Sequence, residues 1–159
     1  MTLSITPEPF DAPSSQELIA ALSAELNVRY GDEDDLYLFE VEAHEVSPPL
    51  GIFLVARIDG EPVGCGALRR LAGRAGHGEV KRMFVSPAAR GAGLGRLLLE
   101  ALEAHAPALG FRVLRLETGD AQPEAVALYR SAGWTEIAGY GRFADEVRSI
   151  CFAKDIGTR

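Results

Sequence analysis

The stretch RGAGLG at residues 90–95 is the part of the chain best suited to bind an anion. It stands between an apolar run that is typical of a strand and a leucine-rich run that is typical of a helix. The first turn of a helix leaves backbone N–H groups unpaired, and glycine lets a bulky phosphate approach them without a Cβ in the way. The sequence therefore predicts a phosphate-binding loop at this position.

Two familiar phosphate-binding patterns do not fit this loop. A P-loop requires a Lys followed by Ser or Thr, which the stretch lacks. The dinucleotide fingerprint GxGxxG would need a third glycine where Arg96 stands, and it would follow the first strand of a βαβ unit rather than three strands of antiparallel type. The pattern that fits is [RQ]xxGx[GA], with Arg90, Gly93 and Gly95 at its fixed positions. Gly91 fills a variable position and is expected to tolerate substitution better.

Together with its flanking segments, this pattern resembles the GNAT superfamily of acetyl-CoA-dependent N-acetyltransferases. EVKRMFVSP at residues 79–87 is similar to the family's fourth strand and its exit. QPEAVALYRSAGW at residues 122–134 is similar to the family's NxxAxxLYxxxGF segment, with Gln122 where the family usually has Asn. The resemblance covers residues 53–134 and is weak before Ser47.

The resemblance implies a fold, a co-substrate and the residues that bind it. The expected fold class is α/β (α+β), a mixed, centrally splayed sheet of six to seven strands flanked by helices, in a single domain over residues 1–159. Acetyl-CoA would be the co-substrate, and family members occur as monomers and homodimers. The backbone amides of residues 91–96 would hold the pyrophosphate, and the pantetheine arm would fill the splay like an extra strand. The implied CoA-binding residues are Met83, Phe84, Val85, Arg90, Gly91, Ala92, Gly93, Leu94, Gly95, Arg96, Gln122 and Tyr129.

The reaction gains from a general base, because only a neutral amine attacks a thioester. A lysine-like amine has a pKa of about 10.4, so about one molecule in 10³ is neutral at pH 7. Glu79 is the first candidate, since it lies six residues before Val85 and on the same face of the predicted strand. Related enzymes often have a glutamate at this position. The alternative is a strand-end carboxylate paired with Lys81 or Arg82, and Glu117 is a second candidate base.

The CoA thiolate that leaves gains from a nearby acid or hydrogen-bond donor. Tyr129 occupies the family's tyrosine position, and a phenol with a pKa of about 10 can donate to the sulfur. The alternative is an aromatic ring that packs on the cofactor or the core. Cys65 and Cys151 show no basic neighbour arrangement, so an acetyl-cysteine intermediate is not expected. The sequence favours direct transfer to a primary amine of a small molecule, peptide or protein.

Residues on the acceptor side carry weaker signals. The acidic run at residues 32–35 could attract a cationic amine, although such a run is more often a solvated loop. Tyr140, Arg142 and Phe143 lie between the last two predicted strands, a loop that borders the acceptor site in the family. None of these residues names the acceptor. Three other functions stay open at this point: transfer from another acyl-CoA, a non-catalytic module that binds or senses acyl-CoA, and an unrelated nucleotide-binding α/β domain.

Hydrophobic periodicity predicts the elements that must position these residues. Helical patterns cover residues 14–30, a segment that begins at about residue 91, and residues 123–131. Strand patterns cover residues 2–6, 52–58, 62–71, 79–85, 112–118, 134–140 and 148–154, with a hairpin turn at Asp59-Gly60. The strands at 79–85 and 112–118 are joined by a helix, so they should be parallel neighbours.

Composition limits the classes of function. The 159 residues carry 16 basic and 23 acidic side chains, a formal net charge of −7, which argues against nonspecific nucleic-acid binding. No apolar run approaches the ~18 residues of a membrane span, and the first residues lack the pattern of a signal peptide. Two cysteines and three histidines without metal-ligand spacing predict no metal site. Buried free thiols are typical of a reducing compartment, so we expect a cytoplasmic protein.

Overall fold

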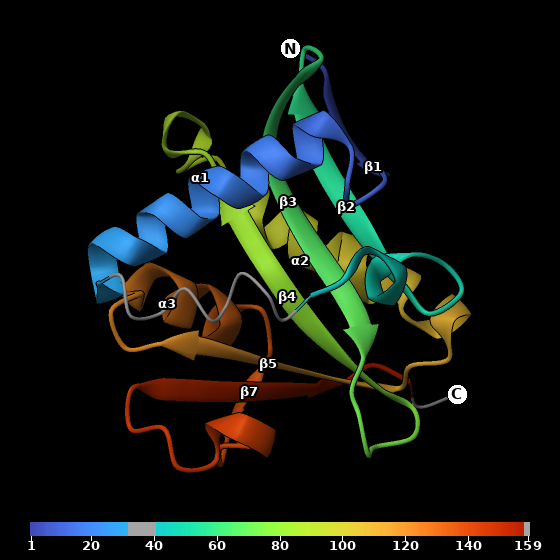
Figure 1. Cartoon of the computed structure of the whole chain (residues 1–159), viewed down its shortest axis with the longest axis vertical. Coiled ribbons are helices and arrows are strands. Elements are labelled where there is room, and N and C mark those ends of the chain that lie inside the picture. Colours follow the sequence, from blue (N-terminus) through green and yellow to red (C-terminus); the bar gives the residue numbers. More distant parts are fainter. Residues whose placement is uncertain (32–40, 158–159) are drawn as a thin grey trace.

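A mixed sheet with helices on both faces forms the frame of the molecule (Figure 1). The computed structural model describes residues 1–31 and 41–157. Within this part of the chain, seven strands are ordered β1-β2-β3-β4-β5-β7-β6. The strands are β1 (Leu3–Pro7), β2 (Gly51–Ile58), β3 (Glu61–Arg70), β4 (His77–Val85), β5 (Val113–Gly119), β6 (Thr135–Ile137) and β7 (Ser149–Asp155). The helices are α1 (Pro13–Tyr30), α2 (Leu94–His105) and α3 (Pro123–Ser131), with short 3-10 turns η2 (Ala43–Val46), η3 (Pro87–Ala89), η4 (Pro107–Leu109) and η5 (Gly141–Phe143). The expected fold class is confirmed.

The first four strands form an antiparallel meander. Asp59 and Gly60 both have positive φ values, 50° and 85°, which a tight hairpin turn between β2 and β3 requires. The predicted turn is therefore confirmed. No helix in the described residues is long and apolar enough to cross a membrane.

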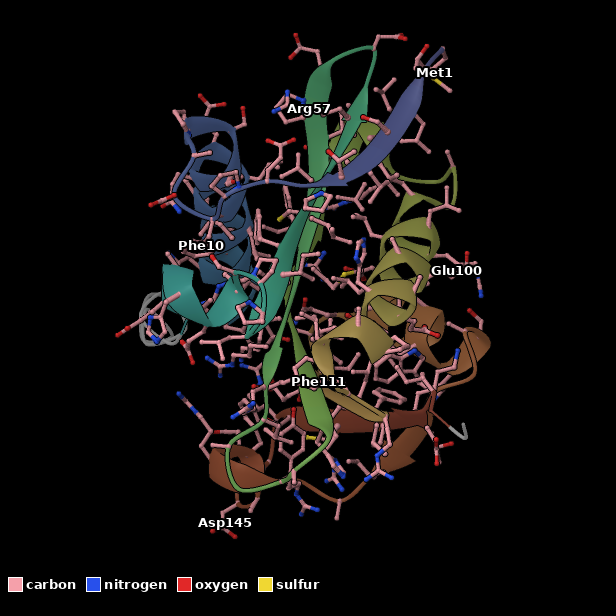
Figure 2. All side chains as sticks on the ribbon, turned by 90° about the vertical axis from the view of Figure 1, so that its right-hand side faces the viewer. Met1, Phe10, Arg57, Glu100, Phe111 and Asp145 are labelled. Carbon is pink, nitrogen blue, oxygen red and sulfur yellow. The ribbon has the colours of Figure 1, made fainter. Side chains whose placement is uncertain are left out.

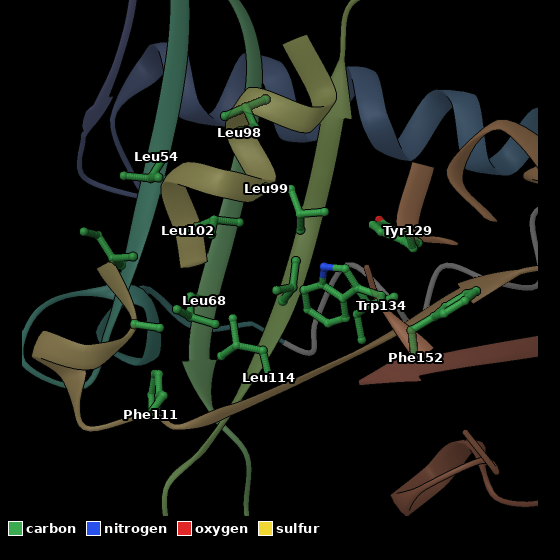
Figure 3. Close-up of a cluster of buried hydrophobic side chains, with 14 of the residues drawn as sticks. Leu54, Leu68, Leu98, Leu99, Leu102, Phe111, Leu114, Tyr129, Trp134 and Phe152 are labelled. Carbon is green, nitrogen blue, oxygen red and sulfur yellow. The ribbon is translucent and has the colours of Figure 1, made fainter. Parts of the chain in front are cut away.

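The alternation of side chains along the strands divides the core into two layers. Leu54 and Leu68 face α2 and pack with its Leu98, Leu99 and Leu102, all fully buried (Figure 3). The residues that alternate with them pack against α1 on the other face of the sheet. Figure 2 shows the sheet nearly edge-on, with α1 on one side and α2 on the other. Truncating one such leucine to alanine costs about 2–5 kcal/mol.

The centre of the sheet is splayed. β4 and β5 are parallel neighbours, as predicted, but they pair only from His77 to Glu79 and from Val113 to Arg115. Beyond that point β5 continues to pair with β7 on its other side, while β4 continues to pair with β3. One edge of β4 between residues 80 and 85 is therefore left open, and the site is built around this opening.

Two predicted elements are shorter than expected. The helix that follows the glycine-rich loop begins at Leu94, because Gly91 and Gly93 have φ values of 90° and 81°, outside the helical region. The sixth strand ends at Ile137. The chain then turns so that the Tyr140 side chain is buried in a small separate cluster of apolar side chains.

Candidate active site

The glycine-rich loop leads into α2 with a run of backbone N–H groups that point to no acceptor in the described residues. Arg90 N–H donates to Pro87, and Leu97 N–H donates to the carbonyl of Gly93 over 3.1 Å. Between them, the backbone N–H groups of residues 91–96 donate to no acceptor among the described residues. Gly93 is the N-cap of α2 in a left-handed conformation. Unpaired N–H groups at the start of a helix are suited to bind an anion.

Two of the three glycines in the loop share one conformational constraint, and the third has a steric one. Gly91 and Gly93 have positive φ values, and a Cβ on either would meet no other atom within 4 Å. Any other L-residue there costs about 1–2 kcal/mol. Gly91 therefore has the same backbone constraint as Gly93, which argues against the expectation that Gly91 tolerates substitution better. Gly95 lies inside α2, where a Cβ would come within 3.3 Å of Leu128 Cδ2.

The two arginines of the loop stabilise its structure. Arg90 donates from Nε to the carbonyl of Val85 (2.8 Å) and from Nη2 to Glu25 of α1. Arg96 donates to Ser131 Oγ at the end of α3. Arg90 thus joins the loop to α1 and to the end of β4, and Arg96 joins it to α3. Both guanidinium groups are already engaged in these contacts.

A cavity of about 150 Å³ lies where β4 and β5 separate. Among the predicted site residues, Met83, Gln122 and Tyr129 line it, and so does Glu117, the second candidate base. Glu79, the first candidate base, does not. The lining residues are Leu22, Leu26, Tyr30, Val80, Lys81, Arg82, Met83, Leu116, Glu117, Thr118, Gly119, Gln122, Tyr129, Glu146, Arg148 and Ser149.

Glu79 is buried within a network of charged and polar side chains. Its Oε1 accepts hydrogen bonds from Nε (3.1 Å) and Nη2 (3.0 Å) of Arg69, and its Oε2 accepts one from the Tyr140 hydroxyl (2.8 Å). Arg69 also pairs with Glu45 of η2 at 3.4 Å. Glu79 is therefore a carboxylate in an ion pair, as the alternative interpretation of the sequence expected, but this ion pair is with Arg69, which the sequence analysis did not name. It joins β4 to β3 and to the segment before η5.

Glu117 lies two residues beyond Arg115 on β5, past the last strand pair. Its Oε2 accepts a hydrogen bond from Ser149 Oγ (2.7 Å). Burial raises the pKa of this carboxyl, and the Ser149 hydrogen bond and the positive charge of Lys81 oppose the rise. A carboxylate with a raised pKa in a cavity is better matched to proton transfer near neutral pH. These contacts favour Glu117 over Glu79 as the base.

Tyr129 packs its ring in the core and also lines the cavity. Its ring is buried against Trp134 (6.2 Å between centroids) and Phe152 (5.7 Å), as Figure 3 shows. The residue also lines the cavity, and its hydroxyl has no hydrogen-bond partner in the described residues. Burial raises the pKa of this phenol well above its usual range. The hydroxyl therefore stays protonated and can donate a hydrogen bond into the cavity.

Tyr30, at the end of α1, is a site residue that the sequence analysis missed. Its hydroxyl accepts hydrogen bonds from Gln122 Nε2 (3.3 Å) and from the backbone N–H of Ala121 (3.1 Å). Gly119 makes this approach possible, because a Cβ there would lie 1.9 Å from the Tyr30 oxygen. The guanidinium of Arg148 stacks over the ring at 4.7 Å. The sequence did contain one signal for this contact, because a glycine at the end of a strand, here Gly119, often marks a place where another group comes close to the backbone.

The predicted acceptor-side residues do not take part in the cavity lining. Tyr140 and Phe143 are buried together, with ring centroids 5.6 Å apart. Lys81 Nζ lies 5.5 Å from the centroid of the Phe143 ring, and the Arg142 guanidinium lies 5.6 Å from it. None of the three lines the cavity directly. The acidic run at residues 32–35 lies outside the described residues.

Neither cysteine is placed to act as a nucleophile. Cys65 and Cys151 are free and buried, and neither lines the cavity. Burial raises the pKa of Cys65 to about 12 and also raises the pKa of Cys151. The Cys65 thiol donates to the carbonyl of Arg82 (3.2 Å). Both thiols are therefore held in their neutral form.

Known proteins share the sequence of this chain over most of its length. The acetyltransferase (GNAT) family model matches residues 16–134. An IAA acetyltransferase of Azospirillum brasilense is 39% identical over 145 residues, which cover 89% of this chain and 92% of that protein. The chain belongs to the GNAT acetyltransferase family and is an N-acetyltransferase, and the resemblance seen in the sequence is confirmed.

Solved structures agree in fold over almost the whole chain. One of them, described as an acyl-CoA N-acyltransferase from Klebsiella pneumoniae, is 32% identical to this chain. The match covers 98% of each chain, with a TM-score of 0.79. An IAA acetyltransferase from Bacillus cereus covers 97% of this chain and 99% of its own, at 19% identity and a TM-score of 0.68. The latter likeness concerns the fold alone.

Proposed function

We propose that this protein transfers the acetyl group of acetyl-CoA directly to a primary amine, with Glu117 as general base and Tyr129 as hydrogen-bond donor to the departing thiolate. The observation that carries the proposal is the cavity at the splay of β4 and β5, because Glu117 and Tyr129 both line it. The CoA pyrophosphate binds the amides of residues 91–96. The pantetheine arm lies along the open edge of β4 at Met83, Phe84 and Val85.

Glu117 accepts the proton that the amine loses as its nitrogen bonds to the thioester carbon, either directly or through one water. Ser149 Oγ holds the carboxylate in one orientation by donating to Oε2 over 2.7 Å. Glu79 is not needed as a proton acceptor in this scheme. Its contacts with Arg69 and Tyr140 support a positioning role, in which it fixes the segments that border the acceptor.

Tyr129 stabilises the leaving group without giving up its proton. An ordinary thiol has a pKa of about 8.5 and an ordinary phenol one of about 10. Because burial raises the pKa of the Tyr129 phenol further, proton transfer from it to a thiolate is unfavourable. A hydrogen bond to the negatively charged sulfur is favourable in the same place. Removing it therefore slows C–S cleavage while the ring contacts with Trp134 and Phe152 persist.

Direct transfer is supported by the state of the two cysteines. A cysteine that carried the acetyl group would need a thiolate in the cavity, whereas burial raises the pKa of both thiols. The free buried thiols also support a cytoplasmic protein. The proposed chemistry uses side chains and backbone amides and no metal ion. It can be completed within one chain, so it is compatible with a monomer or a homodimer.

A steady-state assay that measures CoA release tests the proposal. Acetyl-CoA, propionyl-CoA and succinyl-CoA are each paired with a panel of primary amines. The expected result is the highest kcat/KM with acetyl-CoA, and initial-rate lines that intersect, as direct transfer from a ternary complex requires. Parallel lines, together with an acetylated cysteine in the intact mass, would overturn direct transfer. Preference for a longer acyl-CoA would overturn the donor assignment.

A further inference from the structure

A stripe of side chains on α1 forms one wall of the cavity. Leu22, Leu26 and Tyr30 are spaced by four residues, so they lie on one side of the helix, and all three line the cavity. The two leucines offer only hydrocarbon to a ligand. The Tyr30 hydroxyl is therefore the polar group that α1 contributes to this wall, and the direction of its proton affects what the cavity binds.

The Tyr30 hydroxyl has a proton to donate that no acceptor receives within residues 1–31 and 41–157. Its oxygen accepts one hydrogen bond from the backbone N–H of Ala121 (3.1 Å) and one from Gln122 Nε2 (3.3 Å). A hydroxyl has two acceptor lone pairs and one O–H donor, so these contacts fill its acceptor sites and leave its proton. Burial raises the pKa of Tyr30, and the two hydrogen bonds oppose the rise. The protonated hydroxyl is therefore a donor at the cavity wall.

The hydroxyl lies on the same face of β5 as Glu117. A Cβ on Gly119 would overlap the Tyr30 oxygen, so this oxygen occupies the place of the side chain that Gly119 lacks. β5 stays in register with β7 from residue 113 to 119, and positions 117 and 119 therefore share one face. Two residues along a strand span about 7 Å. The donor and the proposed base are thus within reach of one small molecule.

This face of the sheet belongs to the acceptor rather than to CoA. α1 and α2 cover opposite faces of the sheet (Figure 2). In the proposed function the phosphates bind at the start of α2, so CoA reaches the gap between β4 and β5 from the α2 face. The α1 face, with Glu117 and the Tyr30 hydroxyl, is then left to the amine.

Resting on the proposed function, we propose that Tyr30 determines acceptor specificity by donating its O–H to an oxygen of the acceptor. The amine faces Glu117, the hydrocarbon chain packs on Leu22 and Leu26, and an ether or carbonyl oxygen on that chain faces Tyr30. A chain of hydrocarbon alone would cover the O–H and leave it unpaired, which costs free energy. The site therefore favours primary amines that carry such an oxygen.

The test compares three pairs of primary amines in the CoA-release assay with acetyl-CoA. The pairs are butylamine with 2-methoxyethylamine, pentylamine with 3-methoxypropylamine, and hexylamine with 4-methoxybutylamine. Within a pair an oxygen replaces one CH₂ group, which keeps the length and adds a hydrogen-bond acceptor. Rates are expressed per neutral amine, because the oxygen also lowers the pKa of the amine. One neutral hydrogen bond corresponds to about twofold to tenfold, and kcat/KM for the ether in the best pair should exceed that for its alkyl partner by about this factor.

Tyr30→Phe locates the source of this preference, because it removes the hydroxyl and keeps the ring. The ratio of ether to alkyl amine should fall to one or below, since the ether oxygen loses its donor. The calorimetric Kd for acetyl-CoA should stay unchanged. If this variant does not fold, the ratios of the wild-type protein test the proposal by themselves.

Arg29→Met is the matched control for a merely structural role of Tyr30. Arg29 donates to the carbonyl of Ala121 (2.8 Å) and pairs with Glu124, so it holds the same junction between α1 and α3 (Figure 1). It does not line the cavity. Its loss should lower the Tm and leave the preference for ethers intact. If Arg29→Met abolishes the preference as Tyr30→Phe does, Tyr30 acts by holding the junction and the proposal is overturned.

Other outcomes also overturn the proposal. In the wild-type protein they are a ratio of one or below in all three pairs, and no acetylation of any of these amines while acetyl-CoA still binds. In folded Tyr30→Phe the overturning result is an unchanged ratio, and a raised Kd for acetyl-CoA beside it would assign the O–H to CoA. Failure of the proposed function looks different, because acetyl-CoA then neither stabilises the protein in a thermal-shift assay nor loses its acetyl group to any amine.

Discussion

Replacement of Glu117 by glutamine tests the proposed base with a small change in shape. The amide keeps the volume of the side chain, and its oxygen can still accept the hydrogen bond from Ser149 Oγ. It cannot accept a proton from the amine. A positioned base contributes about 10²- to 10⁴-fold in rate, and each tenfold is ~1.4 kcal/mol of activation free energy. We therefore expect kcat of Glu117→Gln to fall by about 10²- to 10⁴-fold, with little change in the Kd for acetyl-CoA.

The pH profile reports the same group. Burial raises the pKa of Glu117 above its ordinary value of 4.5, and only the carboxylate form can accept a proton. The rate of the wild-type protein should therefore increase as pH rises through a pKa above 4.5. This acid limb should be absent from the profile of Glu117→Gln, measured by CoA release across the acid range.

Glu117→Gln should lower the activity of the protein without lowering its stability. Because the folded pKa of Glu117 is above the unfolded value, the native protein holds this proton more tightly than the unfolded chain. The ionised carboxylate therefore lowers the stability of the native state. This cost is absent below the unfolded pKa, grows as pH rises toward the folded pKa, and is complete above it. At neutral pH, Glu117→Gln should have a Tm equal to or above that of the wild type.

Glu79→Gln is the matched control, because it makes the same chemical change on the neighbouring strand. It disrupts the ion pair with Arg69, so we expect a lower Tm and a higher KM for the amine. The acid limb of the profile should remain. If Glu79→Gln removes that limb and Glu117→Gln keeps it, Glu79 is the base and the reasoning from the cavity is refuted.

Three further substitutions test other parts of the site. Tyr129→Phe should lower kcat by about tenfold to a hundredfold through loss of one charged hydrogen bond, at unchanged acetyl-CoA affinity, and an unchanged kcat would rule out the role at sulfur. Gly93→Val should weaken CoA binding more than Arg90→Ala, because it strains the φ of +81° and crowds the amides, and calorimetric Kd values that agree would contradict this account. Gly119→Ala should lower the Tm, since its Cβ would lie 1.9 Å from the Tyr30 oxygen. In a double-mutant cycle Tyr30→Ala should then cost less than it does in the wild type.

Features that depend on neighbours in the sequence were predicted well. The helix expected at residues 123–131 is α3 with the same limits, because Pro123 fits the first turn and Gly133 follows its end in a left-handed conformation. The hairpin at Asp59-Gly60 is equally local. The glycine-rich loop was found because its residues form a continuous pattern with the strand before it and the helix after it. The pattern did not show that Gly91 shares the positive φ of Gly93, because fixed and variable positions carry no information about φ.

A β-bulge in β4 at Arg82, where the register against β3 shifts, shows why the alternation of side chains does not predict which residues face the cavity. Alternation predicts that Lys81 and Arg82 face opposite sides of β4, yet one residue with positive φ brings both to the cavity. Contacts with β3, which lies earlier in the chain, hold this irregular backbone, and one of them is the hydrogen bond from the Cys65 thiol to the Arg82 carbonyl. No local pattern records such a contact.

The sequence by itself determined the family, the anion-binding loop and the pair of carboxylates from which a base could come, because residue type and short spacing are enough to define them. Only the tertiary structure decided between the carboxylates. Glu79 is paired with Arg69, 10 positions away, and with Tyr140, 61 positions away, whereas Glu117 lines the space between two strands that separate. The role of an acidic side chain depends on the charges and the water around it, and those are set by segments that meet only when the chain folds.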